Sequence, residues 1–110
     1  MTHISVPAPV QALVGAINNA DTDAFVAAFV PDGYVDDWGR VLRGAEGVRS
    51  WANTDAIGAG AQMTVLESGT TDDTTELRFA WKSRVFNGES TAFATVKDGK
   101  LASFRIPPHA

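Results

Sequence analysis

The spacing of apolar residues changes halfway along the chain, and this change restricts the fold more than any other feature of the sequence. Before residue 56 apolar residues recur at helical intervals, as they do from Val10 to Ile17. After residue 62 they alternate with polar residues, as they do from Leu77 to Trp81. Helices grouped early and strands grouped late predict an α+β protein, with helices packed on one face of a curved, mainly antiparallel sheet.

Three helices are expected in the first half. The first ends at Asn18-Asn19, with Ser5 as a candidate N-cap. The second begins at Asp21 or Thr22, stacks Phe25 on Phe29, and is ended by Pro31-Asp32-Gly33. The third follows Gly44, and its apolar face consists of Val48, Trp51 and Ala52.

The expected strands are 34–38, 63–66, 74–86, 89–97 and 100–106. Two dipeptides, Asn87-Gly88 and Asp98-Gly99, are typical of type I′ turns and predict that the last three strands form an antiparallel meander. The sequence contains no repeat, linker or low-complexity tract, so we expect one domain over residues 1–110.

Composition excludes several classes of protein. The 110 residues include no cysteine, which excludes thiol chemistry and disulfides, and the formal charge is −4 with no basic cluster, which argues against nucleic-acid binding. No apolar run reaches the roughly 20 residues needed to span a membrane, and the N-terminus lacks the basic region of a secretory signal. The two histidines, His3 and His109, lie at opposite ends. We therefore expect a cytoplasmic protein with no metal site, no cofactor and no membrane partner.

The chemically interesting segment runs from Asp36 to Arg40. Side chains alternate along a strand, so if Val35 faces the interior Asp37 does too, while Tyr34, Asp36 and Trp38 share the other face. A carboxylate on the wall of a cavity loses hydration, which raises its pKa toward the range of a general base. Asp37 is therefore the candidate base. The alternative is that Asp37 pairs with Arg40 or Arg43 and only fixes the loop to the sheet.

The aromatic residues are the second feature. Buried tryptophan needs a partner for its N–H and often lines pockets, so Trp38 and Trp51 are candidates for facing a cavity. Plain core packing accounts for Phe25, Phe29, Phe79 and Phe104.

The order of these elements, with the segments 16–23, 29–33, 35–39 and 43–49 and the turn 98–101, resembles the nuclear transport factor 2-like superfamily. Within it, the sequence is similar to the SnoaL-like proteins. The resemblance implies a cone-shaped fold whose mouth holds Asp37, Trp38, Arg40 and Trp51. Leu13, Ile17 and Phe93 would be further contacts for a small apolar or aromatic molecule.

The resemblance also implies a range of activities. Asp37 matches the general base of ketosteroid isomerase, but the oxyanion-hole positions correspond to Leu13 and about Ala92, which are apolar, so steroid isomerisation is not expected. The inner positions of strand 89–97, which run from Thr91 to Val96, offer no carboxylate for cyclase chemistry. Three readings stay open: an isomerase, lyase or hydrolase that uses Asp37, a non-catalytic binder, and a dimerising domain with a filled cone. A homodimer would form through the outer face of the sheet, with residues such as Phe79 and Trp81 or their neighbours.

Overall fold

The structure is a computed structural model that describes residues 6–108. Three helices pack on one face of a six-stranded mixed sheet, which confirms the predicted α+β class. The helices are α1 (Ala8–Asn18), α2 (Thr22–Ala27) and α3 (Gly44–Asp55), and a short 3-10 helix, η1 (Ile57–Ala59), follows α3. The strands are β1 (Phe29–Asp37), β2 (Arg40–Arg43), β3 (Gln62–Thr71), β4 (Thr74–Lys82), β5 (Asn87–Lys97) and β6 (Lys100–Ile106).

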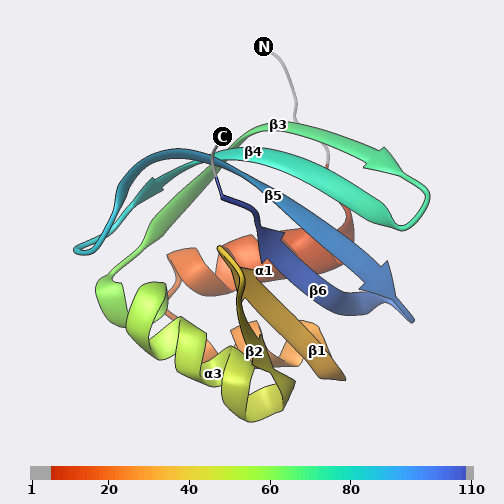
Figure 1. The fold of residues 1–110 in the computed structure, drawn as a ribbon, viewed down its shortest axis with the longest axis horizontal. Coiled ribbons are helices and arrows are strands. Elements are labelled where there is room, and N and C mark those ends of the chain that lie inside the picture. Colours follow the sequence, from red (N-terminus) through yellow and green to blue (C-terminus); the bar gives the residue numbers. More distant parts are fainter. Residues whose placement is uncertain (1–5, 109–110) are drawn as a thin grey trace.

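The strand order is β2-β1-β6-β5-β4-β3, with β1 and β6 parallel and every other neighbouring pair antiparallel. The sheet bends over the helices, so that β3, β4 and β5 arch above α1 (Figure 1). Register shifts interrupt the β3–β4 pairing after Val65 and the β5–β6 pairing after Thr95. Such shifts increase local twist and bend, which matches the curvature of these strands.

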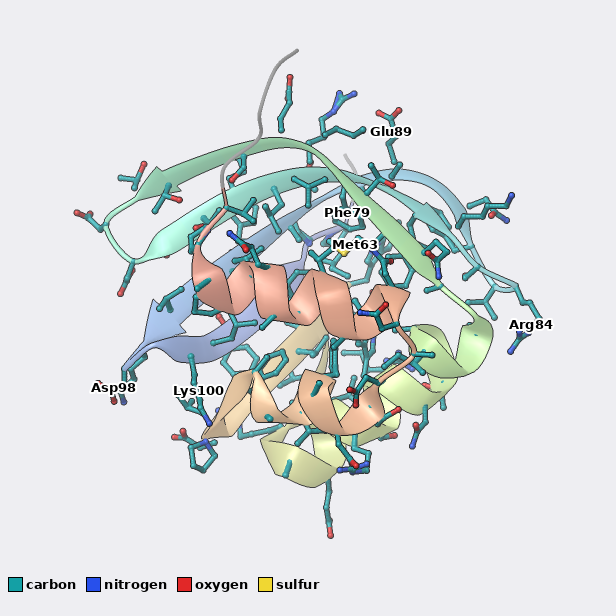
Figure 2. The ribbon with its side chains drawn as sticks, turned by 180° about the vertical axis from the view of Figure 1, so that it is seen from behind. Met63, Phe79, Arg84, Glu89, Asp98 and Lys100 are labelled. Atoms are coloured by element: carbon teal, nitrogen blue, oxygen red, sulfur yellow. The ribbon has the colours of Figure 1, made fainter. Side chains whose placement is uncertain are left out.

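The core fills the space between the sheet and the helices. Met63 and Phe79 point from the sheet toward α1, whereas Glu89 points away from the opposite face (Figure 2). Trp51 of α3 lies at the centre, with its ring 5.8 Å from Phe25 and 6.2 Å from Phe104. Trp51 therefore packs α3 against both α2 and β6.

The α1 and α3 helices form where the apolar spacing predicts them. Val10, Leu13 and Ile17 are buried on α1, and Val48 and Trp51 are buried on α3. Asp21 caps α2 by accepting a hydrogen bond from the backbone N–H of Ala24 at 3.1 Å. The candidate cap Ser5 and both histidines lie outside the described residues.

The predicted end of the second helix is wrong. The helix stops at Ala27, and Phe29 already begins β1, which continues through Pro31-Asp32-Gly33. The cause is tertiary: the N–H of Leu101 donates to the carbonyl of Ala28, and Phe29 pairs with Leu101 of β6. The rings of Phe25 and Phe29 still meet, at 5.5 Å.

Two turns also differ from the prediction. Asn87 and Gly88 belong to β5, paired with Lys82 and Trp81, and the turn lies earlier, over residues 83–86. The Ser83 hydroxyl oxygen accepts the backbone N–H groups of Val85 and Phe86, which closes that turn. The Asp98-Gly99 turn forms as predicted, with φ of 54° and 79°.

The prediction missed β2, which makes a hairpin with β1. Trp38 and Gly39 occupy the turn with φ of 56° and 91°, so Trp38 leaves the strand alternation and does not share a face with Tyr34 and Asp36.

The proposed dimer contacts are wrong as well. Phe79 and Trp81 are buried and turned inward, Trp81 with its ring 6.1 Å from that of Trp51.

No helix among the described residues is long and apolar enough to cross a membrane.

Candidate functional site

A cavity of about 310 Å³ opens between the end of α3 and the concave face of the sheet. Its lining comes from β1 and the turn after it, α3, β4 and the turn after it, β5 and β6, and consists of Asp37, Trp38, Trp51, Asp55, Phe79, Trp81, Val85, Phe86, Ser90 and Ile106. Five of these ten residues are aromatic, and they include all three tryptophans of the chain. The cavity therefore has apolar walls and a few polar groups, as small-molecule sites commonly do.

Asp37 lies on the cavity wall as the strand alternation predicts, since Val35 is buried on the same face of β1. The side chain of Asp37 is 23% exposed, which places it between the interior and solvent. Its Oδ2 accepts a hydrogen bond from the indole Nε1–H of Trp51 at 3.0 Å. Trp51 itself is 1% exposed, so this carboxylate satisfies a buried donor.

Arg40 is the arginine that approaches Asp37, one of the two alternatives left open by the sequence. One guanidinium nitrogen, Nη2, lies 3.5 Å from Asp37 Oδ2 and 2.9 Å from Asp55 Oδ2. Arg43 turns elsewhere, with its guanidinium 4.5 Å from the ring centre of Tyr34. Arg40 therefore bridges two carboxylates at the polar end of the cavity, and its side chain is 54% exposed.

The mouth of the cavity is apolar. Trp38, Val85 and Phe86 line it and are 56%, 66% and 47% exposed. They come from two hairpin turns, the one between β1 and β2 and the one between β4 and β5. The second turn is held against η1, because the backbone N–H of Arg84 donates to the Ala59 carbonyl at 2.9 Å. An apolar ligand could thus extend beyond the cavity onto this rim.

The structure brings some sequence-predicted site residues together and leaves others apart. Asp37, Trp38 and Trp51 line the cavity, and Arg40 contacts its two carboxylates. Leu13 and Ile17 are buried in the core between α1 and the sheet and are not among the lining residues. Phe93 faces away from the cavity, and the guanidinium carbon of Arg105 lies 5.6 Å from its ring centre.

Sequence reasoning missed seven of the ten lining residues. Asp55 follows Trp51 by four residues, a spacing that places both on one helix face and could have revealed it. Phe79, Trp81 and Ser90 lie on the inward faces of β4 and β5, but the sequence does not say which face of a strand covers the helices. Val85 and Phe86 could not be placed while the turn was expected at Asn87-Gly88.

No protein-family model and no curated protein matches the sequence. Many solved structures resemble this chain. A proposed polyketide cyclase from Sinorhizobium meliloti is 28% identical, with a TM-score of 0.81 over 92% of this chain and 94% of that one. A Mycobacterium tuberculosis protein solved with estradiol-17β-hemisuccinate is 14% identical, with a TM-score of 0.79 over 92% and 91%. A protein with a ketosteroid isomerase-like fold from Catenulispora acidiphila, solved with trimethylamine, is 17% identical, with a TM-score of 0.80 over 94% and 87%.

Proposed function

We propose that this chain, which belongs to the nuclear transport factor 2-like superfamily and is related there to the SnoaL-like proteins, binds a small apolar or aromatic molecule with one polar group. The observation that carries the proposal is the cavity of about 310 Å³, with aromatic walls and carboxylates at one end only. The ligands held by the Mycobacterium and Catenulispora structures support the idea that this fold can hold such molecules. In this reading the sheet and helices form the cone expected from the resemblance.

Asp37 is the polar contact in this proposal. Trp51 and Arg40 hold its Oδ2, so the carboxylate has a fixed orientation toward the cavity. It can accept a hydrogen bond from the ligand, or a proton if the protein is an isomerase, lyase or hydrolase. The buried apolar residues Leu13 and Ala92 offer no side-chain donor for a developing oxyanion, which favours binding over steroid isomerisation.

Binding can be tested with the protein's own fluorescence, because all three tryptophans line the cavity. A library of apolar and aromatic compounds is screened by thermal shift, and hits are confirmed by ligand-dependent tryptophan quenching. Ser90→Leu should fill the cavity and abolish the shift. Thr91→Leu is the matched control, since Thr91 lies next along β5 and faces the other side of the sheet. Hits that bind both variants equally would contradict the proposed site.

Asp37→Asn separates binding from catalysis, because asparagine keeps an oxygen that can accept the Trp51 N–H. A binder should retain its hits in this variant. An acid–base enzyme that uses Asp37 should still bind but lose turnover of any hit that wild-type protein converts. If wild-type protein converts none of its hits, and Asp37→Asn binds them unchanged, the catalytic reading fails.

Dimerisation through the outer face of the sheet remains a proposal of ours. That face carries the Arg78–Glu89 ion pair at 2.6 Å and the Arg105–Phe93 contact, so it is mixed rather than apolar. Sedimentation at micromolar concentration tests it. A monomer would exclude dimerisation at that concentration, and a dimer that Phe93→Arg leaves unchanged would exclude this surface as its contact.

A further inference from the structure

The polar end of the cavity carries an excess of negative charge. Asp37 and Asp55 supply two carboxylates, and Arg40 supplies one guanidinium to both, so the three groups have a formal charge of −1. Building on the proposed ligand-binding function, we infer that the cavity selects ligands in which a protonated amine is attached to an apolar body. A failure of this inference leaves the binding function itself intact.

The other arginines near the cavity are held elsewhere. None of the ten lining residues is lysine or arginine. Arg43 lies over Tyr34 and donates to the Asp32 carbonyl at 3.3 Å. Arg84 donates to the Gly58 carbonyl and lies at the outer edge of the molecule, at the tip of the β4–β5 hairpin (Figure 2). Among the described residues, Arg40 is therefore the cation that reaches the two carboxylates, and it cannot balance both.

The α3 helix adds to the negative potential. Asp55 is its last residue, so the carbonyl end of the helix lies beside the cavity. This end carries the negative pole of the helix macrodipole, and α3 has no basic residue in its last turn to offset it. The effect is independent of the side-chain charges and has the same sign.

The walls suit a cation as well. Trp38, Trp51, Trp81, Phe79 and Phe86 present π-systems that attract cations when a ring face is within about 6 Å. Ionised carboxylates can only accept hydrogen bonds, so an ammonium or a hydroxyl can donate to them. An anionic ligand would instead face two like charges. The expected order of affinity is amine, then alcohol, then carboxylate.

Three probes that share one apolar body test this order: 2-(1-naphthyl)ethylamine, 2-(1-naphthyl)ethanol and 1-naphthaleneacetate. Their affinities are measured by isothermal titration calorimetry at pH 7 and low salt. The amine should bind about five- to tenfold more tightly than the alcohol, and the anion should bind weakest. Raising the salt concentration should reduce the difference between amine and alcohol, because the carboxylates are partly exposed.

Charge variants identify the source of the selectivity. Asp55→Asn should lower the amine-to-alcohol affinity ratio several-fold, whereas Arg40→Gln should raise it because it removes the neutralising guanidinium. Asp98→Asn removes the same charge at the opposite end of the sheet and should leave the ratio unchanged (Figure 2). Circular dichroism checks that each variant is folded.

Equal binding of the three probes, or tightest binding of the alcohol or the anion, would overturn the inference while leaving the proposed binding function in place. An amine-to-alcohol ratio that falls equally in Asp55→Asn and Asp98→Asn would overturn it too, since the effect would then be one of net charge. If none of the three probes binds at millimolar concentration, both the proposed function and the inference fail.

Discussion

The hydrogen bond between Trp51 and Asp37 should couple the stability of α3 to that of β1, and a double-mutant cycle with Trp51→Phe and Asp37→Leu measures that coupling. The indole N–H lies on a side chain that is 1% exposed, and it donates to a carboxylate oxygen at 3.0 Å. Asp37→Leu alone leaves this donor buried without its acceptor, which costs roughly 1–3 kcal/mol. The ion pair lost with Arg40 adds at most about 1 kcal/mol, because Arg40 is 54% exposed and still contacts Asp55.

Trp51→Phe alone costs roughly 2 kcal/mol, mainly from the smaller ring in a close-packed core. It leaves Asp37 without its donor, but Asp37 is 23% exposed and water can replace the bond. The double variant loses both partners, so no donor is left unsatisfied. Its destabilisation should therefore fall short of the sum of the single variants by about 1–2 kcal/mol.

Urea unfolding at pH 7 followed by far-ultraviolet circular dichroism measures the four free energies without depending on the altered tryptophan. A control cycle pairs Asp37→Leu with Trp81→Phe, since the Trp81 N–H donates to Ser83 instead, at 3.3 Å. That cycle should be additive to within about 0.5 kcal/mol. A coupling energy in the Trp51 cycle no larger than in the control would refute the reasoning.

Three further outcomes are expected. Gly58→Ala should lower the unfolding free energy by at least about 3 kcal/mol, because the added Cβ would lie 1.5 Å from a backbone oxygen of α3. Gly15→Ala is the contrast, because its added Cβ would meet no atom within 4 Å, and it should raise the unfolding free energy by about 0.5–1 kcal/mol in the same urea assay. Asn18→Ala should lower the unfolding free energy by about 2–3 kcal/mol, because the Asn18 amide makes two hydrogen bonds to the β3 backbone, at 2.9 and 2.7 Å. An equal loss of stability in Asn19→Ala, at the exposed neighbour, would argue against this cause. Phe93→Ala should leave the affinity of any ligand that quenches tryptophan fluorescence unchanged, because Phe93 lies on the outer face; a weaker affinity would show that the ligand site is not the cavity.

Local patterns in the sequence were enough for several elements. The helical stripes of α1 and α3, the Asp21 cap and the Asp98-Gly99 turn depend on interactions within a few residues, and all formed as predicted. The alternation from Val35 to Asp37 likewise placed the carboxylate on the inner face. These features follow from backbone geometry and side-chain direction, which short segments already possess.

The failures have a common cause. The second helix ends early because β6 pairs with Phe29, and the β4–β5 turn lies early because Ser83 and η1 hold it there. The β6 pairing and the η1 contact come from residues far away in sequence, and a local terminator or turn signal loses to them, whereas the Ser83 hydrogen bonds are local. The same holds for Phe79 and Trp81, whose alternation was clear but whose direction was not.

By itself, the sequence determined the α+β class, the helix faces and the side of β1 on which Asp37 lies, because each depends on periodicity. Tertiary structure alone decided which residues surround Asp37. It brought Trp51 and Asp55 from α3, Trp81 from β4 and Phe86 from the following turn to one cavity. It also placed Arg40, rather than Arg43, within contact of the two carboxylates. The physical reason is that the charge balance and the shape of the cavity arise from contacts between elements. No single segment of the sequence contains these contacts.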